Sequence, residues 1–334
     1  MDRTGRMRDT SRRGDDFNDR PIRAKLIFNP FSGRWDESPA QLFQILTHLQ
    51  AWRIHPEVTL VGPNMRLVEV VEDAIQRGMR LILVSGGDGT IDIAAGAMVD
   101  TEATLGILPT GTRNNIALSL GIPTGDLAKA VALLRRGRRV RIDVGQAHSG
   151  RSHPWFLELA SVGLVSALYP GADELQHGNL ARISDLLATL ISMPVAEMRL
   201  NLEGGKQPIS TMGHVVLAAN MPYLGPNFRL AENISPFDGL IDVFVFANLN
   251  KLELLGYAVQ MVGGIPQDAR IQHYQVSRLE VRTIPRMPVL ADGNLLGEAS
   301  LRIIMHKQCL AVMAPPGALT RMAHSKLTNR TPHA

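Results

Sequence analysis

The chain has 334 residues, of which 45% are hydrophobic and 20% charged, with a formal net charge of +4 and one cysteine, Cys309. This length exceeds what one core commonly serves and predicts two domains. The composition is typical of a soluble globular protein, and the small net charge does not indicate a nucleic-acid partner. One cysteine excludes a disulfide framework or a cysteine-rich zinc site and favours a reducing cytoplasm. No apolar run reaches the roughly 18 residues of a membrane-spanning helix, so we expect any membrane contact to be peripheral.

The first part of the chain alternates between strand and helix patterns. Residues 1–21 mix arginines with aspartates and are expected to form a solvated tail. Within residues 22–139, β-favouring runs at 24–28, 58–60, 81–84 and 104–108 alternate with amphipathic helical patterns. Strands that alternate with helices predict an α/β domain built on a parallel sheet.

The second part, residues 140–315, is dominated by strand patterns. We expect helices only near 173–193 and 250–263, and strands at 141–145, 155–161, 196–202, 213–219, 241–246, 274–281 and 301–305. Successive strands with turn signals predict a β-rich, antiparallel, sandwich-like domain. A last strand at 309–313 fits either domain, and residues 316–334 are expected to form a second tail.

Polar or glycine-rich turns follow three of the predicted parallel strands, at 29–33, 85–90 and 109–115. In such sheets, ligands bind at the carboxyl ends of the strands. The glycines at 86, 87 and 89 can adopt positive φ and leave backbone N–H groups open to a phosphate. A carboxylate in such a turn, Asp88, makes sense if a divalent cation lies between it and the phosphates. The alternative is that Asp88 only caps the helix that follows.

The order of these motifs is more specific than any one of them. Gly86-Gly87-Asp88-Gly89-Thr90 lies between an upstream Asn29-Pro30-x-Ser32-Gly33 and a downstream Gly111-Thr112-x-Asn114. Together they resemble the catalytic domain of diacylglycerol kinases and related lipid kinases, a superfamily that shares the Gly-Gly-Asp-Gly turn with NAD kinases and phosphofructokinases. The resemblance covers residues 22–315. It implies an N-terminal α/β domain and a C-terminal β-rich domain, with ATP in the cleft between them.

The same resemblance implies roles for individual residues. Asp88 and Asn115 would belong to the network around a catalytic Mg²⁺. Asp238, with backbone oxygens near Ser235 and Leu240, would hold a second, structural Mg²⁺, although Asp238-Gly239 also fits an ordinary turn. The nucleotide-binding residues would be Asn29, Pro30, Ser32, Gly33, Thr59, Gly86, Gly87, Asp88, Gly89, Thr90, Gly111, Thr112 and Asn114.

Two positions depart from the family pattern. Asp292-Gly293-Asn294 stands where the family has Asp-Gly-Glu, the segment that supplies the general base. The neutral amide of Asn294 cannot accept the proton of a substrate hydroxyl, which leaves Asp292 for that role. Asn115 stands where many relatives place an aspartate. Its amide contributes no charge to the metal network.

These observations predict an ATP- and Mg²⁺-dependent kinase that phosphorylates a hydroxyl of a lipid such as diacylglycerol or a sphingoid base. We expect a cytoplasmic protein that contacts its lipid peripherally at the inner membrane face and has no nucleic-acid partner. The sequence leaves open whether it forms a homodimer. One alternative is an NAD kinase-like phosphotransferase with a soluble substrate. The other, motivated by Asn294 and Asn115, is a catalytically impaired homologue that binds nucleotide or lipid.

Overall fold

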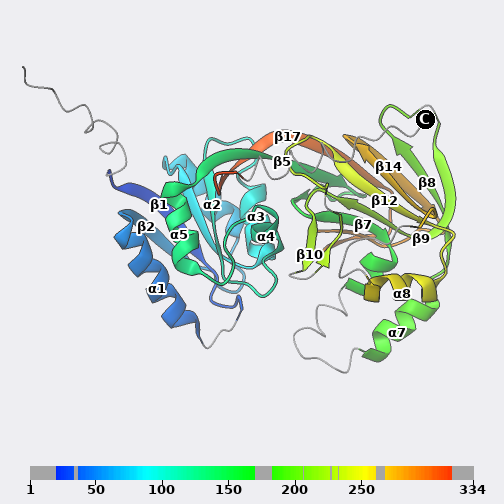
Figure 1. Ribbon diagram of the computed structural model, residues 1–334, viewed down its shortest axis with the longest axis horizontal. Coiled ribbons are helices and arrows are strands. Elements are labelled where there is room, and N and C mark those ends of the chain that lie inside the picture. Colours follow the sequence, from blue (N-terminus) through cyan, green and yellow to red (C-terminus); the bar gives the residue numbers. More distant parts are fainter. Residues whose placement is uncertain are drawn as a thin grey trace, which may run out of the picture.

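A computed structural model of the chain shows two lobes joined by two long strands, β5 and β17 (Figure 1). The expected tails lie almost entirely outside the described residues. Among the described residues, no helix combines the length and apolar character needed to cross a bilayer. The structure describes residues 20–33, 37–169, 183–205, 207–225, 228–231, 233–260 and 268–317.

The N-terminal lobe is a parallel sheet with helices on both faces. Its strands lie in the order β4-β3-β1-β2, and each neighbouring pair is parallel. The predicted α/β domain with a parallel sheet is thus confirmed. The strands are β1 (Ile22–Phe28), β2 (Ile54–Leu60), β3 (Leu81–Gly86) and β4 (Thr104–Pro109), and the helices are α1 (Ser38–Ala51), α2 (Leu67–Gln76), α3 (Asp88–Gly96), α4 (Asn115–Ser119) and α5 (Leu127–Arg136).

Both faces of this sheet are buried, which explains why its strands read as continuous apolar runs. On one face, Ile82 and Val84 of β3 pack in a cluster with residues of α2, α3 and α4. On the other face, Leu81 and Leu83 join residues of α1 and α5. The helices cover the two faces of the sheet and leave the turns after β1, β3 and β4 uncovered at its edge.

The C-terminal lobe is built from antiparallel strands, which confirms the predicted β-rich domain. Its helices are α7 (Ile183–Ser192) and α8 (Lys251–Gln260). The strands are β5 (Arg138–His148), β6 (Trp155–Phe156), β7 (Leu159–Gly163), β8 (Ala196–Leu202), β9 (Ile209–Ala219), β10 (Tyr223–Gly225), β11 (Phe228–Arg229), β12 (Ile241–Ala247), β13 (Ile271–Val276), β14 (Arg278–Ile284), β15 (Val289–Ala291), β16 (Asn294–Gly297) and β17 (Leu301–Ala314).

Three strand expectations need correction. The run expected at 155–161 is two strands, because β6 pairs with β5 whereas β7 pairs with β9 and β15. The run expected at 274–281 is two strands, because β13 pairs with β12 whereas β14, beginning at Arg278, pairs with β8 and β17. The runs expected at 301–305 and 309–313 are one strand, β17, whose register against β5 shifts between His306 and Leu310. Beyond this shift β17 pairs in parallel with β4, so it is hydrogen-bonded to strands of both lobes.

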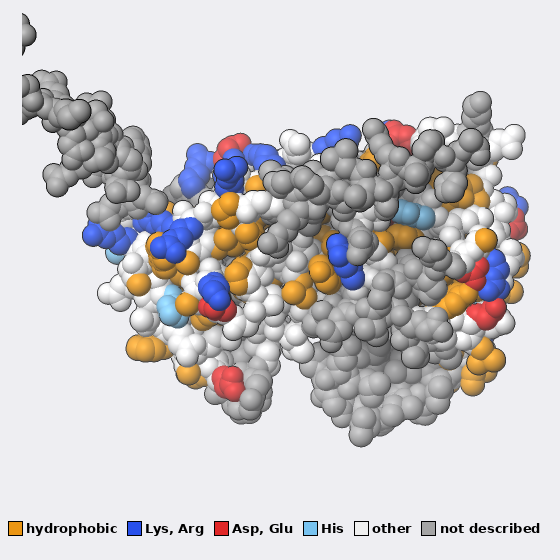
Figure 2. All heavy atoms as spheres, in the orientation of Figure 1, with side chains coloured by type: hydrophobic (Ala, Val, Ile, Leu, Met, Phe, Trp, Pro, Cys, Tyr) orange, Lys and Arg blue, Asp and Glu red, His pale blue; other side chains and the backbone are white. Residues whose placement is uncertain are grey.

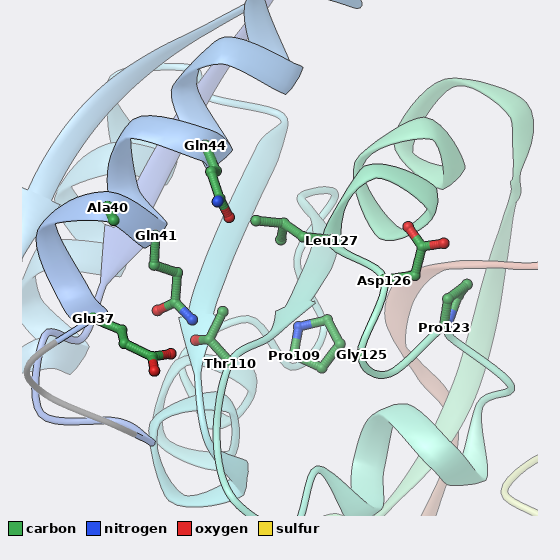
Figure 3. A pocket seen from close by; sticks show the side chains of 10 residues that line it. All are labelled: Glu37, Ala40, Gln41, Gln44, Pro109, Thr110, Pro123, Gly125, Asp126 and Leu127. Atoms are coloured by element: carbon green, nitrogen blue, oxygen red, sulfur yellow. The ribbon is translucent and has the colours of Figure 1, made fainter.

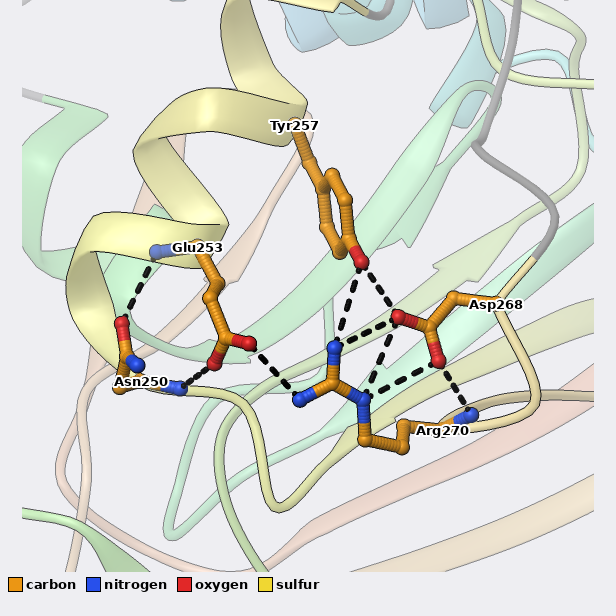
Figure 4. A network of polar contacts seen from close by, with 5 residues as sticks. All are labelled: Asn250, Glu253, Tyr257, Asp268 and Arg270. Carbon is orange, nitrogen blue, oxygen red and sulfur yellow. Dashed lines mark hydrogen bonds and ion pairs between the residues drawn. The ribbon is translucent and has the colours of Figure 1, made fainter.

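A polar network fixes α8 to the start of β13 (Figure 4). The guanidinium of Arg270 binds Glu253 Oε1 at 2.8 Å and Asp268 Oδ2 at 2.8 Å, and the hydroxyl of Tyr257 also donates to Asp268. Arg270 lowers the pKa of Asp268 well below its usual value. The network holds α8 against an apolar cluster that includes Phe244.

Candidate active site between the lobes

Three turns of the N-terminal lobe lie side by side, because β1, β3 and β4 are neighbours in the sheet. Asn29 Nδ2 in the first turn donates to Thr90 Oγ1 in the second at 2.8 Å. Ser32 Oγ in the first turn accepts the backbone N–H of Gly87 at 2.7 Å. The predicted convergence of these turns at one edge of the sheet is therefore observed as direct hydrogen bonding.

The third turn is packed against the first. A Cβ at Gly33, where φ is +72°, would lie 2.6 Å from the carbonyl oxygen of Thr110. Asn114 folds back on the same turn: its Oδ1 accepts from Gly111 N at 3.0 Å and its Nδ2 donates to Gly111 O at 2.7 Å. Asn114 adopts left-handed φ and ψ of 54° and 39°, which asparagine tolerates better than most residues. Asn114 therefore shapes the backbone of the turn.

The other predicted nucleotide-binding residues lie around these turns. Pro30 is partly exposed within the first turn, and Thr112 is exposed at the tip of the third. Thr59 lies near the carboxyl end of β2, opposite Ile27 in the register with β1. The backbone of Gly89 has open space around it, since a Cβ there would meet nothing within 4 Å. The structure thus places all of these residues along the carboxyl edge of the sheet.

A cavity of about 370 Å³ lies beside the third turn, between the start of α1 and the loop that precedes α5. Figure 3 shows Thr110 and Pro109, at the end of β4, facing the side chains of Gln41 and Gln44 on α1. The cavity lies at the carboxyl edge of the sheet, on the side away from the turn at 86–90. Polar groups line it on the side of α1.

Asp88 caps a helix, but not the helix that it begins. Its Oδ1 accepts the backbone N–H of Ile116 in α4 at 3.1 Å, and Gly87 at the start of α3 has no side-chain cap. Burial raises the pKa of Asp88, which the backbone amides of Ile116 and Asn115 and the charge of Arg113 partly offset. The alternative that Asp88 only caps the helix that follows it is therefore wrong, because its carboxylate caps α4 instead of α3. This cap joins α3 to α4 and brings Asp88 beside Asn115.

The general-base candidate, Asp292, occupies the turn of a β-hairpin from the C-terminal lobe. Its φ is +37° and that of Gly293 is +81°, as an Asp-Gly turn between antiparallel strands requires. The carboxylate of Asp292 accepts backbone N–H groups of Leu157, Glu158 and Leu159, the last at 2.8 Å. These amides fix the orientation of the carboxylate. They also counteract the rise in its pKa that burial causes.

Asn294 lies next to this carboxylate in sequence but turns away from it. Its side chain is exposed, and its Nδ2 donates to the backbone oxygen of Asp292 at 3.3 Å. Of the two residues, the structure places only Asp292 among the other acidic side chains. We therefore retain Asp292 as the candidate base.

Two acidic residues of this centre were missed in the sequence. Asp92 on α3, 7% exposed, shares a side-chain hydrogen bond with Asp292, and burial raises its pKa well above the usual value. Glu158, 9% exposed, lies close enough to interact with the side chain of Asn115, and burial likewise raises its pKa. Both interact with the charge of Asp88. Each is a lone acid in an apolar pattern, which is the signal that could have identified it.

The donor atoms around Asp88 suit a hard cation. Asn115 Oδ1 is buried and has no hydrogen-bond partner in the part of the chain that the structure describes, and carboxylate and amide oxygens are what Mg²⁺ prefers. Within the described ranges, no three His, Cys, Asp or Glu side chains form a complete ligand set. A cation here would therefore also draw on phosphate oxygens and water, as Mg²⁺ usually does.

In the turn predicted to hold a second cation, carboxylate oxygens accept hydrogen bonds from backbone N–H groups of the protein. Asp238 Oδ1 accepts from Leu240 N at 2.9 Å, as in an ordinary Asp-Gly turn. The neighbouring Asp143 accepts from the backbone N–H groups of Gly239 and Gln308. Ser235 is buried beside them. The geometry matches the plain-turn alternative and leaves the metal role of Ser235, Asp238 and Leu240 as a prediction.

Comparison with known proteins explains this arrangement. Residues 23–147 match the model of the diacylglycerol kinase catalytic domain, and residues 170–314 match that of the YegS C-terminal NAD kinase beta sandwich-like domain. The N-terminal lobe therefore contains a diacylglycerol kinase catalytic domain, and the two matches together cover most of the chain. The protein is a kinase, and its relatives support lipid-kinase activity.

The sequences of individual relatives align with most of this kinase. A diacylglycerol kinase of Bacillus subtilis is 28% identical over 281 residues, which are 82% of this chain and 90% of the relative. One of Mycobacterium tuberculosis is 25% identical over 249 residues, covering 72% and 79%. The crystal structure of a Bacillus anthracis diacylglycerol kinase superposes with a TM-score of 0.68 at 20% identity, over 89% of this chain and 98% of that chain. The last likeness supports the fold alone.

Proposed function

We propose that this kinase transfers the γ-phosphoryl group of ATP to a hydroxyl of a lipid such as diacylglycerol or a sphingoid base, with Mg²⁺ bound beside Asp88. One observation carries the proposal. The turn at 86–90 of the N-terminal lobe and the Asp292 hairpin of the C-terminal lobe meet across one acidic centre. Phosphoryl transfer needs this combination of positioned phosphates and a nearby acceptor for the hydroxyl proton.

The three turns are suited to binding the phosphates of ATP. The segment from Gly86 to Thr90 runs from the last residue of β3 into the first turn of α3, which begins at Asp88, so its N–H groups and the positive end of the helix favour an anion. Ser32 already accepts the N–H of Gly87, which fixes the loop before a ligand arrives. Gly89 leaves room for a close approach to a phosphate, because nothing lies within 4 Å of its Cβ direction.

In this proposal, Asp292 receives the proton of the lipid hydroxyl. In the transfer, the hydroxyl oxygen bonds to the γ-phosphorus, the bond to the β,γ-bridging oxygen breaks and ADP leaves with its electron pair. The hydroxyl proton passes to the carboxylate of Asp292, whose orientation the amides of 157–159 fix. When bound, Mg²⁺ neutralises charge on the transferring phosphates, and Asp88 and Asn115 would hold it.

We expect the lipid to be reached at the inner face of a membrane from the cytoplasm. The arginines at the lobe junction contribute little to membrane contact, because Arg139 and Arg141 both pair with Glu102 and Arg135 binds backbone oxygens. Figure 2 shows Lys and Arg side chains gathered on the N-terminal side of the molecule.

The decisive assay supplies the purified chain with γ-labelled ATP, Mg²⁺ and mixed micelles containing either diacylglycerol or sphingosine. Label should appear in the organic-extractable product. A parallel reaction with NAD tests the alternative of an NAD kinase-like enzyme, for which label would appear in NADP. ATP binding without transfer to any acceptor would identify an impaired homologue and overturn the proposal.

Asp88→Ala is the matched test of the site. Transfer should be lost because the residue that joins the phosphate turn to α4 and the metal network is removed. Glu197→Gln, at a half-buried position of β8 where the carboxylate pairs with Arg199, is the control and should keep full activity. Full activity in Asp88→Ala would contradict the role given to that residue.

A further inference from the structure

The centre lacks one carboxylate that the proposed function would use. Asn115 occupies a buried position, 5% exposed, where the family pattern led us to expect an aspartate. An amide can bind a cation or a metal-bound water through its oxygen, but it supplies no negative charge. The question is whether another residue of this chain supplies that charge at the same place.

Glu158 reaches Asn115 from the opposite lobe. Its backbone is fixed at both ends of the peptide: its N–H donates to Asp292, and its carbonyl oxygen accepts from Asn220 N at 2.9 Å. With the backbone fixed, its side chain extends toward the side chain of Asn115 and comes close enough to interact with it. The Glu158 carboxylate therefore lies next to the place that a carboxylate at position 115 would occupy.

The surroundings of Glu158 point to a cation. Asn115 Oδ1 and Asp92 Oδ1 are buried and have no hydrogen-bond partner among the described residues. Four acidic side chains interact here, those of Asp88, Asp92, Glu158 and Asp292. Buried like charges repel one another unless a cation or a proton compensates them. Oxygen atoms without donors, together with excess negative charge, are what a divalent cation would satisfy.

We infer that Glu158 supplies the second carboxylate of the catalytic Mg²⁺ site, together with Asp88 and the amide oxygen of Asn115. The inference rests on the proposed function, since Mg²⁺ matters here only if ATP is the phosphoryl donor. In this arrangement, the second carboxylate of the site comes from the C-terminal lobe, at Glu158, instead of from position 115 of the N-terminal lobe. The cation would then link the two lobes when they hold substrate.

The test exchanges charge between the two positions. Four full-length proteins are compared: the natural chain, Glu158→Gln, Asn115→Asp, and the double variant that carries both changes. Mn²⁺ binding is measured by the loss of the free Mn²⁺ signal in electron paramagnetic resonance, without nucleotide and with saturating ADP. Glu197→Gln is the control for removal of a remote carboxylate, and it should bind Mn²⁺ as the natural chain does.

Glu158→Gln should weaken Mn²⁺ binding at least tenfold, because one of two carboxylates is lost. The double variant should recover most of this affinity, since Asn115→Asp returns a carboxylate to the same place. The inference is overturned if Glu158→Gln binds Mn²⁺ as tightly as the natural chain, or if the double variant is no better than Glu158→Gln. A natural chain that binds no Mn²⁺ in either condition also overturns it.

Glu158→Asp replaces Glu158→Gln if the latter does not fold. It keeps the charge but withdraws the carboxylate by one methylene, so Mn²⁺ binding should fall severalfold; unchanged binding contradicts the inference. Failure of the proposed function would look different. In that case the natural chain would bind Mn²⁺ through Glu158, yet the micelle assay would show no labelled lipid.

Discussion

Gly87 and Gly111 lie in direct backbone contact, although they belong to turns that follow different strands. A Cβ on Gly111 would lie 2.3 Å from the Cα of Gly87 and 3.0 Å from its nitrogen. Because side-chain carbons do not approach a backbone so closely, the turn at 86–90 can keep its position only while residue 111 is glycine. The turn at 109–115 thus packs against the turn at 85–90 and holds its backbone in place.

Gly111→Ala should therefore displace the turn at 86–90. We expect a loss of about 1–3 kcal/mol in unfolding free energy, the usual cost of overpacking, and weaker ATP binding. Urea unfolding and calorimetric ATP titration measure the two effects. Gly62→Ala is the matched control, because a Cβ there meets nothing within 4 Å. Equal stability of the two variants would contradict the contact.

Gly89→Ala separates ligand binding from folding. The position has open space for a Cβ, so the unfolding free energy should stay within about 1 kcal/mol of the natural chain or rise slightly. ATP affinity should nevertheless fall, because the added methyl group meets the phosphates. Unchanged ATP affinity would mean that the phosphates do not approach this part of the turn.

The hydrogen bond from Asn29 to Thr90 should couple the first two turns energetically. Asn29→Ala and Thr90→Val are each expected to cost about 1 kcal/mol, and the double variant should cost less than their sum. Urea unfolding of the four proteins completes the double-mutant cycle. Additive losses would show that the two side chains act independently.

Asp292→Asn should lower kcat by about 100-fold or more, because an amide cannot accept the hydroxyl proton. The KM for ATP should change little, since Asp292 lies on the opposite lobe from the phosphate turns. Asn294→Glu provides the contrast: its side chain is exposed, and activity should be preserved or raised. Steady-state kinetics on lipid micelles measure both, and a clear loss in Asn294→Glu would show that position 294 acts differently from our assignment.

Asp92→Asn should make the protein more stable at neutral pH. Burial raises the pKa of Asp92 in the folded state, so the folded chain favours the protonated form and loses stability as pH rises through that pKa. The amide of Asn has no charge to bury, so at pH 8 the substitution should raise the free energy of unfolding by about 1–3 kcal/mol. The gain should vanish near pH 4, where the natural Asp92 is protonated. Thermal unfolding across this range tests it, with the exposed Asp73→Asn as control.

Much of the N-terminal lobe could be predicted because its signals are local. Each strand, its turn and the helix that follows are contiguous, and glycine, proline and asparagine mark where the chain must turn. The three turns meet because parallel neighbours end at one edge of the sheet. The sequence by itself therefore determined the α/β sheet, the phosphate-type turn and the identity of Asp88 and Asp292 as candidates.

The acidic centre was decided only by the tertiary structure. Asp92 and Asp292 are 200 positions apart, and although Glu158 stands out as a lone acid in an apolar run, no local pattern places it beside Asp92. They meet because β17 pairs with β5 and with β4 and so holds the two lobes together. Such long-range pairing leaves no periodic trace in the chain. For the same reason, the sequence showed Asn115 as a missing charge, and only the fold showed Glu158 beside it.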